Sequence, residues 1–266
     1  MYETNYHRAS SAGEAKSLMG SAEDGKIIAG GQTLIPTMKQ RLAAPSDLVD
    51  IAAIGDLAGI SIEGNQVTIG ACTTHAQVAG DSSLQAVCPA ICDLASHIGD
   101  PAVRHKGTIG GSIANNDPAA DYPAAMVALN AQINTDKRSI SSGDFFVGLF
   151  ETALDDDEII TSVSFAAPAK AAYAKFPNPA SRYAMAGVFV ARMGDGSAHV
   201  GITGAGSDGV FSHPGMEAAL TSDWSAGAIA NQSVDADNML SDIHADSAYR
   251  ANLVKVMAGR AVTAAG

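Results

Sequence analysis

The chain has 266 residues, of which 47% are apolar and only 17% charged, and its formal net charge is −12. This composition is typical of a globular protein and excludes an intrinsically disordered chain. The length exceeds that of most single domains, so two or three packed units are expected. The acidic excess argues against a nucleic acid or an anionic membrane as partner, because both require a basic face.

The compartment can be predicted from two further features. No apolar run is long enough to cross a bilayer, and the first eight residues lack the apolar core of a signal peptide. Three cysteines, Cys72, Cys88 and Cys92, form no disulfide framework and suit a reducing compartment. The sequence therefore predicts a cytoplasmic protein without a transmembrane segment.

The first third of the chain predicts one helix and a small sheet. Ser11 and Glu14 have the spacing of a capping box, and the residues that follow predict a helix that Gly25 ends. Strands are expected at 26–29, 47–51, 59–62 and 66–71, with a hairpin turn at 63–65.

The rest of the chain mixes helices and strands. Thr74 with Gln77 begins a short helix, Pro89 begins another that runs towards His97, and Asp121 is placed to cap a third over 123–129. Strands are expected at 132–135, 159–165, 187–192 and 198–203, and an amphipathic helix at 246–261. Because there is no steady alternation of strand and helix, the pattern favours the α+β class over a doubly wound parallel sheet.

Two glycine-rich loops are the candidate binding site for a phosphate group. Ala29-Gly-Gly-Gln-Thr33 and Thr108-Ile-Gly-Gly-Ser112 can each expose consecutive backbone N–H groups beside hydroxyl donors, which is what a pyrophosphate needs. Without Cβ atoms the backbone can approach a ligand closely. Either loop alone is more often a simple tight turn, but two loops of matching chemistry favour a shared nucleotide site. Neither has the spacing of a Rossmann loop.

One true dinucleotide fingerprint, Gly204-Ala-Gly-Ser-Asp-Gly209, is interpreted as a turn. The residues after it cannot open a helix directly, and too little chain remains for a dinucleotide-binding fold.

Three other patterns also favour structural interpretations. The cysteines lack a fourth ligand at tight spacing, so packing is favoured over a metal or iron–sulfur site. Ser112 misses the spacing of a nucleophile elbow. The acidic run 155–158 lacks the pattern of a calcium loop and predicts a solvated turn.

The segments 29–42 and 108–123 contain the two loops. They resemble the FAD-binding medium subunit of molybdenum hydroxylases, a group that is also called the xanthine dehydrogenase family. Within this group the resemblance is greatest to the aerobic carbon-monoxide dehydrogenase type. Supporting stretches at 6–8, 47–51, 69–74, 100–104, 158–160 and 249–262 extend the resemblance over nearly the whole chain. It implies an α+β, PCMH-type (vanillyl-alcohol-oxidase-like) fold with FAD-binding subdomains at 1–55 and 56–166. A C-terminal sheet-and-helix domain would follow at 167–266.

The resemblance also implies which residues hold the cofactor. Ala29, Gly30, Gly31, Gln32, Thr33 and Leu34 would form the first FAD loop, and Thr108, Ile109, Gly110, Gly111 and Ser112 the second. Thr74, Asp117, Asp121, Ile160 and Lys175 match positions that line the flavin or its ribityl chain. No catalytic acid or base and no metal ligand is expected in this chain.

Such subunits work inside a larger assembly. The resemblance implies a large molybdopterin-binding subunit and a small subunit with [2Fe–2S] clusters, together a dimer of heterotrimers in which FAD passes electrons from the clusters to an external acceptor. Peripheral association of that complex with a membrane stays open.

Two other functions remain as alternatives. One is a stand-alone FAD-dependent oxidoreductase, and the other is a non-catalytic nucleotide-binding module. The substrate of the whole complex, whether carbon monoxide, a purine, an N-heterocycle or an aldehyde, cannot be predicted from this chain, and neither can the acceptor.

Overall fold

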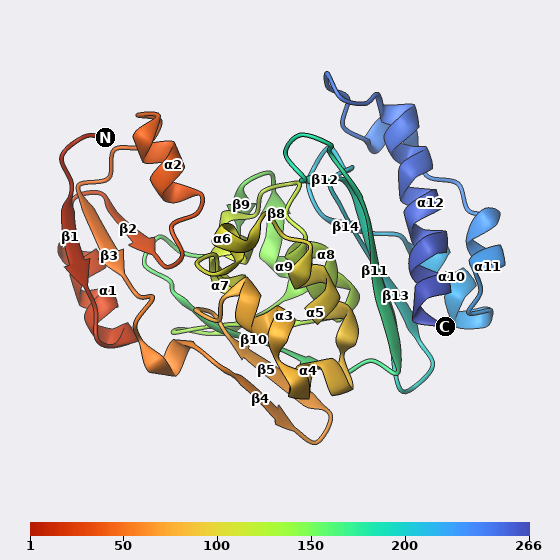
Figure 1. Cartoon of the computed structure of the whole chain (residues 1–266), viewed down its shortest axis with the longest axis horizontal. Helices are drawn as coiled ribbons and strands as arrows, with labels where there is room; N and C mark the ends of the chain where they lie inside the picture. Colours follow the sequence, from red (N-terminus) through yellow and green to blue (C-terminus); the bar gives the residue numbers. More distant parts are fainter.

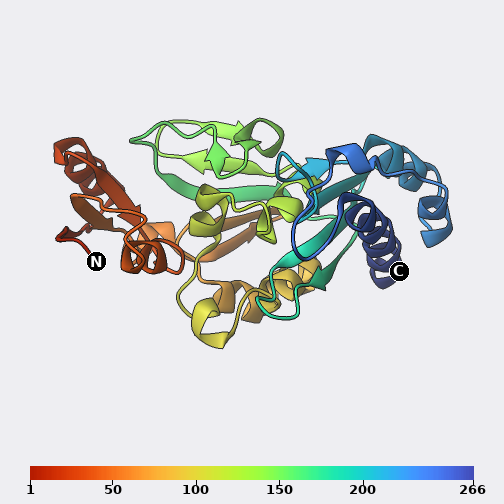
Figure 2. The ribbon, with the colours of Figure 1, turned by 90° about the horizontal axis from the view of Figure 1, so that it is seen from above.

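The computed structural model describes residues 1–266, which form three larger sheets that follow one another along the chain and one two-stranded hairpin (Figure 1). Seen from above, the N-terminal and C-terminal parts lie at opposite ends of an elongated molecule, with the central part between them (Figure 2). One sheet is parallel and the others are antiparallel, so the predicted α+β class is confirmed.

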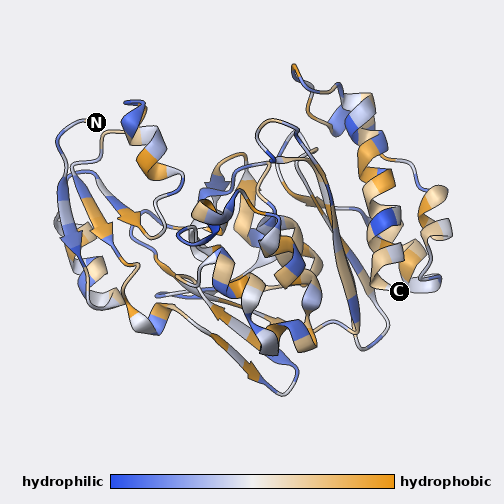
Figure 3. Cartoon of the chain, viewed as in Figure 1, coloured by the Kyte–Doolittle hydropathy of each residue, from blue (hydrophilic) through white to orange (hydrophobic).

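The N-terminal sheet has three parallel strands in the order β1-β3-β2: β1 (Asn5–Arg8), β2 (Gly25–Ile28) and β3 (Asp47–Asp50). The helix α1 (Ala12–Ser21) connects β1 to β2, and α2 (Leu34–Lys39) follows β2. As predicted, the Ser11 side chain accepts a hydrogen bond from the Glu14 N–H. The helix ends at Ser21 because Ala22 is extended, and Gly25 begins a strand instead of ending the helix. The edge strand β1 is hydrophilic (Figure 3).

The central sheet has five antiparallel strands in the order β4-β5-β10-β6-β7. They are β4 (Ile60–Glu63), β5 (Gln66–Gly70), β6 (Gln132–Thr135), β7 (Ser139–Ser141) and β10 (Ile160–Ala166). The predicted hairpin between β4 and β5 is confirmed, with Gly64 at φ 61° in its turn. A small hairpin of β8 (Phe146–Gly148) and β9 (Glu151–Thr152) lies beside this sheet.

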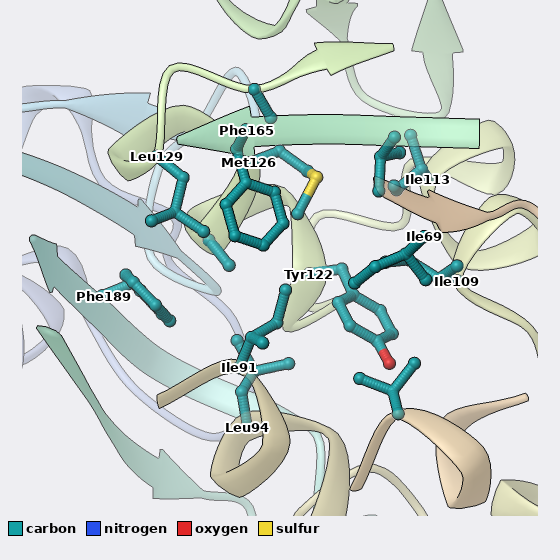
Figure 4. Packing of buried hydrophobic residues seen from close by; sticks show 14 of the residues in the cluster. Ile69, Ile91, Leu94, Ile109, Ile113, Tyr122, Met126, Leu129, Phe165 and Phe189 are labelled. Carbon is teal, nitrogen blue, oxygen red and sulfur yellow. The ribbon is translucent and has the colours of Figure 1, made fainter. Parts of the chain in front are cut away.

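Seven helices belong to this central part: α3 (His75–Gly80), α4 (Ser82–Val87), α5 (Pro89–Ser96), α6 (Pro101–Arg104), α7 (Ile109–Asn115), α8 (Tyr122–Ala128) and α9 (Ser142–Phe145). Thr74 and Gln77 form the predicted capping box of α3, and Pro89 occupies the first turn of α5. Buried side chains of α5, α7 and α8 meet those of β5 and β10 in the largest apolar cluster, with Tyr122 and Phe165 among them (Figure 4).

The C-terminal sheet is antiparallel: β11 (Lys170–Pro177), β12 (Ala184–Arg192), β13 (Ala198–Thr203) and β14 (Phe211–Ser212). Its helices are α10 (Pro214–Ser222), α11 (Ala226–Ala230) and α12 (Ser247–Ala265). The last helix confirms the one expected at 246–261; Asp246 is its N-cap, and the Asp246 side chain accepts a hydrogen bond from the Tyr249 N–H. None of the helices has the length and apolarity needed to cross a bilayer.

The fingerprint at 204–209 is a turn, as predicted. It joins β13 to β14 and is followed by a strand, and the next helix begins only at Pro214. Gly204, at φ 80°, donates its N–H to the Pro118 carbonyl and so ties this turn to the chain before α8.

The three cysteines are free and buried in apolar clusters. Burial raises the pKa of Cys72 and Cys88 to about 11 and that of Cys92 to about 12. Thiols that stay protonated in apolar surroundings act as small packing groups, which agrees with the structural interpretation.

Two sequence interpretations were wrong. The segment 108–112 is not a loop: Thr108 is the N-cap of α7, and the residues after it form the first turn of that helix. The Asp121 side chain makes no capping bond to α8, because it is engaged by β11. The second error arises because local spacing does not reveal which distant strand lies beside a residue.

The acidic run 155–158 is only partly a solvated turn. The Glu158 side chain is fully buried, and it accepts hydrogen bonds from Arg138 Nε (3.0 Å), the Thr135 hydroxyl (2.7 Å) and the Asp155 N–H (3.0 Å). The Arg138 guanidinium and the hydroxyl hold the pKa of Glu158 at about 2.

Because this pKa lies below the ordinary 4.5, the carboxylate stabilises the fold above pH 4.5 and loses that contribution as the pH falls towards 2. We therefore expect Glu158→Gln to lower the free energy of unfolding at pH 7 by about 2 kcal/mol. Between pH 4.5 and 2 the variant should lose less further stability than the wild type. Thermal unfolding over a pH series measures both effects, and parallel acid limbs would contradict the assignment.

Candidate functional site

A cleft of about 800 Å³ lies between the N-terminal sheet and the central part of the chain. Its walls come from β2 and the start of α2, from the segment 98–121 that contains α6 and α7, and from 154–160 and 175–183. Such a volume lies in the range of pockets that hold extended organic ligands and cofactors.

The two glycine loops converge in this cleft. A Cβ atom on Gly30 would lie only 2.2 Å from the Lys106 carbonyl oxygen and 2.7 Å from the Gly107 Cα. The first loop therefore packs backbone to backbone against the residues that lead into the second. Gly31 has φ 66°, a conformation in which glycine carries no steric cost. Only glycine at position 30 allows the two segments to pack this closely.

The first loop presents unused donors. The backbone N–H groups of Gly30, Gly31, Gln32 and Thr33 donate no hydrogen bond to any other part of the chain. They precede α2, and all four residues line the cleft. A run of free amides at the start of a helix is suited to binding an anionic group such as a diphosphate.

The second loop differs from the sequence expectation. The N–H groups of Ile109 and Gly110 donate to the carbonyls of Thr73 and Ala71, and that of Gly111 donates to the Thr108 hydroxyl. The second loop does not present a run of free amides. It instead offers the hydroxyls of Thr108 and Ser112 and a surface without side chains at Gly111, where an added Cβ would meet only the Thr108 hydroxyl, at 3.0 Å.

The structure brings together nearly all residues singled out in the sequence. All but two of them line the cleft: Ala29, Gly30, Gly31, Gln32, Thr33, Leu34, Thr108, Gly110, Gly111, Ser112, Asp117, Asp121, Ile160 and Lys175. Thr74 and Ile109 do not. The Thr74 hydroxyl is part of the α3 capping box, and Ile109 is buried in the central core.

Asp121 and Lys175 form a buried ion pair in the cleft wall. Lys175 Nζ lies 3.0 Å from Asp121 Oδ2, the side chains are only 8% and 5% exposed, and the Tyr173 hydroxyl donates to Asp121 Oδ1. Burial raises the pKa of Asp121 above its usual value, and the charge of Lys175 partly opposes that shift. The ion pair therefore holds two opposite charges at a fixed position in the wall of a cleft that is partly lined by apolar side chains.

Sequence reasoning missed several cleft residues. His75 is buried, and its Nδ1 has no hydrogen-bond partner. Burial, with a smaller contribution from Arg104, lowers its pKa to about 4, so the ring is neutral at neutral pH. The loop 180–183 also lines the cleft, next to Lys175 at the end of β11. Its only sequence signal was the pair of prolines at 177 and 179, which marks a turn and not a site.

Comparisons with known proteins agree with this geometry. Residues 2–168 match the model of the FAD binding domain in molybdopterin dehydrogenase. The chain is 39% identical to the carbon monoxide dehydrogenase medium chain of Afipia carboxidovorans, over 70% of this chain and 67% of that one. It is 33% identical to the nicotine 6-hydroxylase medium subunit of Paenarthrobacter nicotinovorans, over 98% and 96%.

The fold is similar as well. A chain in the structure of reconstituted CO dehydrogenase from Oligotropha carboxidovorans superposes with a TM-score of 0.88 at 33% identity, over 99% of this chain and 97% of that chain. The family match covers more than half of the sequence and includes both loops. This chain therefore belongs to the family of FAD-binding domains of molybdopterin dehydrogenases, as an oxidoreductase component of the medium-subunit type.

Proposed function

We propose that this chain is the electron-transfer subunit of a heteromeric molybdenum hydroxylase. It holds FAD in the cleft, on a route by which electrons pass from [2Fe–2S] clusters to an external acceptor. The observation that supports this most is the row of free amides at 30–33 packed against the segment that leads into Thr108. When bound, FAD supplies reversible redox chemistry that can link one-electron donors to two-electron acceptors.

The residues of the cleft fit this cofactor. The free amides and the start of α2 suit the diphosphate, and the bare backbone at Gly111 leaves room for it. The cleft volume of about 800 Å³ suits a dinucleotide. We assign the diphosphate to Ala29, Gly30, Gly31, Gln32, Thr33 and Leu34, with Thr108, Gly110, Gly111 and Ser112 on the opposite side.

The remaining cleft residues would hold the rest of the cofactor. We assign Asp117, Asp121, Ile160 and Lys175 to the flavin and its ribityl chain, because all four line the cleft and match the family positions given above for that part of the cofactor. Thr74 and Ile109 act indirectly in this assignment: each supports the backbone of the second loop, through the Thr74–Thr108 bridge and the bond from the Ile109 N–H to Thr73.

No side chain of the chain is required to act as a general acid or base. The ammonium of Lys175 is held in place by Asp121, and the neutral His75 packs on Gly107, where an added Cβ would lie 2.6 Å from His75 Nε2. These groups bind, orient and exclude water, and the fixed charge beside the cofactor influences its potential.

The same proposal includes partners and domain limits. Relatives are named medium chains or subunits, so we infer a large molybdopterin-binding chain and a small [2Fe–2S] chain, arranged as a dimer of heterotrimers. We propose subdomains at 1–55, 56–166 and 167–266. Each range supplies most of one apolar cluster, although Tyr173 and Phe189 join the central cluster and Cys72 and Ile159 join the N-terminal one. Relatives named for substrates as different as carbon monoxide and nicotine suggest that another chain selects the substrate.

The test is to produce the chain together with its large and small partner chains. We expect one FAD per chain by absorbance, and stable copurification with a molybdenum-containing and an iron–sulfur chain. Substrate should reduce the flavin in the complex but not in the isolated subunit. A single chain that oxidises an organic substrate alone, or one that takes up no FAD, would overturn the proposal.

A further inference from the structure

His75 is buried at the start of α3 with an imidazole ring that makes no hydrogen bond within the chain. The residue is only 4% exposed, and its Nδ1 is fully enclosed without a partner. A buried donor or acceptor without a partner destabilises a fold. A leucine would fill a similar volume without that cost, so packing alone does not explain a histidine at this position.

The ring is held between the second loop and the central core. The His75 N–H donates to the Gly107 carbonyl (2.9 Å), which ties the residue to the chain just before Thr108. The ring of Tyr122, a member of the central cluster (Figure 4), packs against the imidazole with 5.4 Å between centroids and a tilt of 44°. These contacts fix the direction in which the polar edge of the imidazole points.

The edge that carries Nε2 lies beside both glycine loops. A Cβ atom on Gly107 would be only 2.6 Å from His75 Nε2, and the Cα of the same Gly107 would be 2.7 Å from a Cβ on Gly30. One residue therefore separates Nε2 from the free amides of the first loop. His75 also lines the cleft, and because Nδ1 is enclosed, Nε2 is the ring nitrogen that can reach a ligand there.

The protonation state makes Nε2 a donor. Because the pKa of His75 is lowered to about 4, the ring is neutral at neutral pH and carries one N–H and one acceptor nitrogen. In protein interiors an N–H group without an acceptor is rarer than an acceptor without a donor, so the proton belongs on Nε2 and the lone pair on the enclosed Nδ1. The side chain thus presents a single N–H donor to the cleft.

We infer that His75 is a cofactor-binding residue whose Nε2–H donates a hydrogen bond to an oxygen of the FAD diphosphate. This inference rests on the proposed function, because it adds one side-chain donor to the backbone amides assigned to the same diphosphate. It also explains the unpaired imidazole: a donor that packing holds in place before the ligand arrives loses little freedom on binding.

The test uses His75→Leu and His75→Gln in the full chain, freed of FAD and then titrated with it. Leucine has no polar atom, whereas the side-chain amide of glutamine can place an N–H near the position of Nε2. His105→Leu is the matched control, because His105 is exposed, lies two residues before Gly107 and does not line the cleft. The measurements are the Tm of the FAD-free chain, the dissociation constant of FAD from flavin fluorescence, and the inhibition constant of ADP as competitor.

We expect His75→Leu to bind FAD about tenfold more weakly than the wild type, which is the effect of one lost hydrogen bond. The Tm of the FAD-free variant should be unchanged or higher, because the substitution removes an unpaired buried group. The affinity for ADP, which carries the diphosphate but no flavin, should fall by the same factor. His75→Gln should recover most of the affinity, and His105→Leu should bind like the wild type.

Wild-type FAD affinity in His75→Leu would overturn the role of His75 and leave the proposed function intact. A lower Tm of the FAD-free variant together with weaker binding would overturn it as well, since that pair of results marks a structural residue. Equal weakness of His75→Gln and His75→Leu would overturn the hydrogen bond, and a loss confined to FAD would overturn the diphosphate as its acceptor. A wild-type chain that takes up no FAD would overturn both the inference and the proposed function.

Discussion

Gly111→Val is expected to abolish FAD binding while the chain stays folded. In α7 an added Cβ at this position meets only the Thr108 hydroxyl, at 3.0 Å, and that hydroxyl needs to move by only a few tenths of an ångström to admit it. The new methyl groups would instead occupy the cleft surface assigned to the diphosphate. We expect at least a hundredfold loss of FAD affinity, measured by quenching of flavin fluorescence, with a change in Tm of only a few degrees.

Variants at two other glycines distinguish an effect on the cofactor site from an effect on the stability of the fold. Gly259 lies in α12, where an added Cβ would have no atom within 4 Å, so Gly259→Val should bind FAD like the wild type. Gly30→Ala should lose both stability and FAD, because its methyl group would collide with the Lys106 carbonyl. Normal FAD binding by Gly111→Val would show that the second loop does not face the cofactor.

Lys175→Met is expected to destabilise the chain at neutral pH by about 3–5 kcal/mol, the usual cost of leaving a buried charge without its partner. In this variant the Tyr173 hydroxyl is the only remaining hydrogen-bond donor to the Asp121 carboxylate, which stays buried in the cleft wall. Chemical denaturation at pH 7 measures this loss. The double variant Asp121→Asn/Lys175→Met removes the buried charge as well and should recover much of the stability.

The loss in Lys175→Met should depend on pH. The folded pKa of Asp121 already lies above its usual 3.8, and removal of the lysine, which lowers it, raises it further. A carboxyl with a raised folded pKa binds its proton more tightly in the native state, so its ionisation destabilises the fold as the pH rises above 3.8. The variant should therefore be closest to the wild type near pH 4 and furthest from it at pH 7. An equal loss at both values would show that Asp121 carries no buried charge.

Sequence alone determined the helix caps and turns, because these features depend on contacts between residues only three or four positions apart. Ser11 with Glu14 and Thr74 with Gln77 each cap a helix within one turn, so their spacing predicted the two helices. The glycine pairs of the two loops were recognisable for the same reason, since residues without Cβ atoms mark close backbone approach wherever they occur.

Only the tertiary structure decided which of these local features meet. Asp121 has the position of a helix cap, yet it pairs with Lys175, 54 residues away, because β11 passes beside it. The amides of the second loop look available in the sequence, but Gly110 donates to Ala71 on the neighbouring chain segment. Pairings across sheets depend on strand order and register, which local spacing does not encode, whereas a cap or a turn is complete within a few residues.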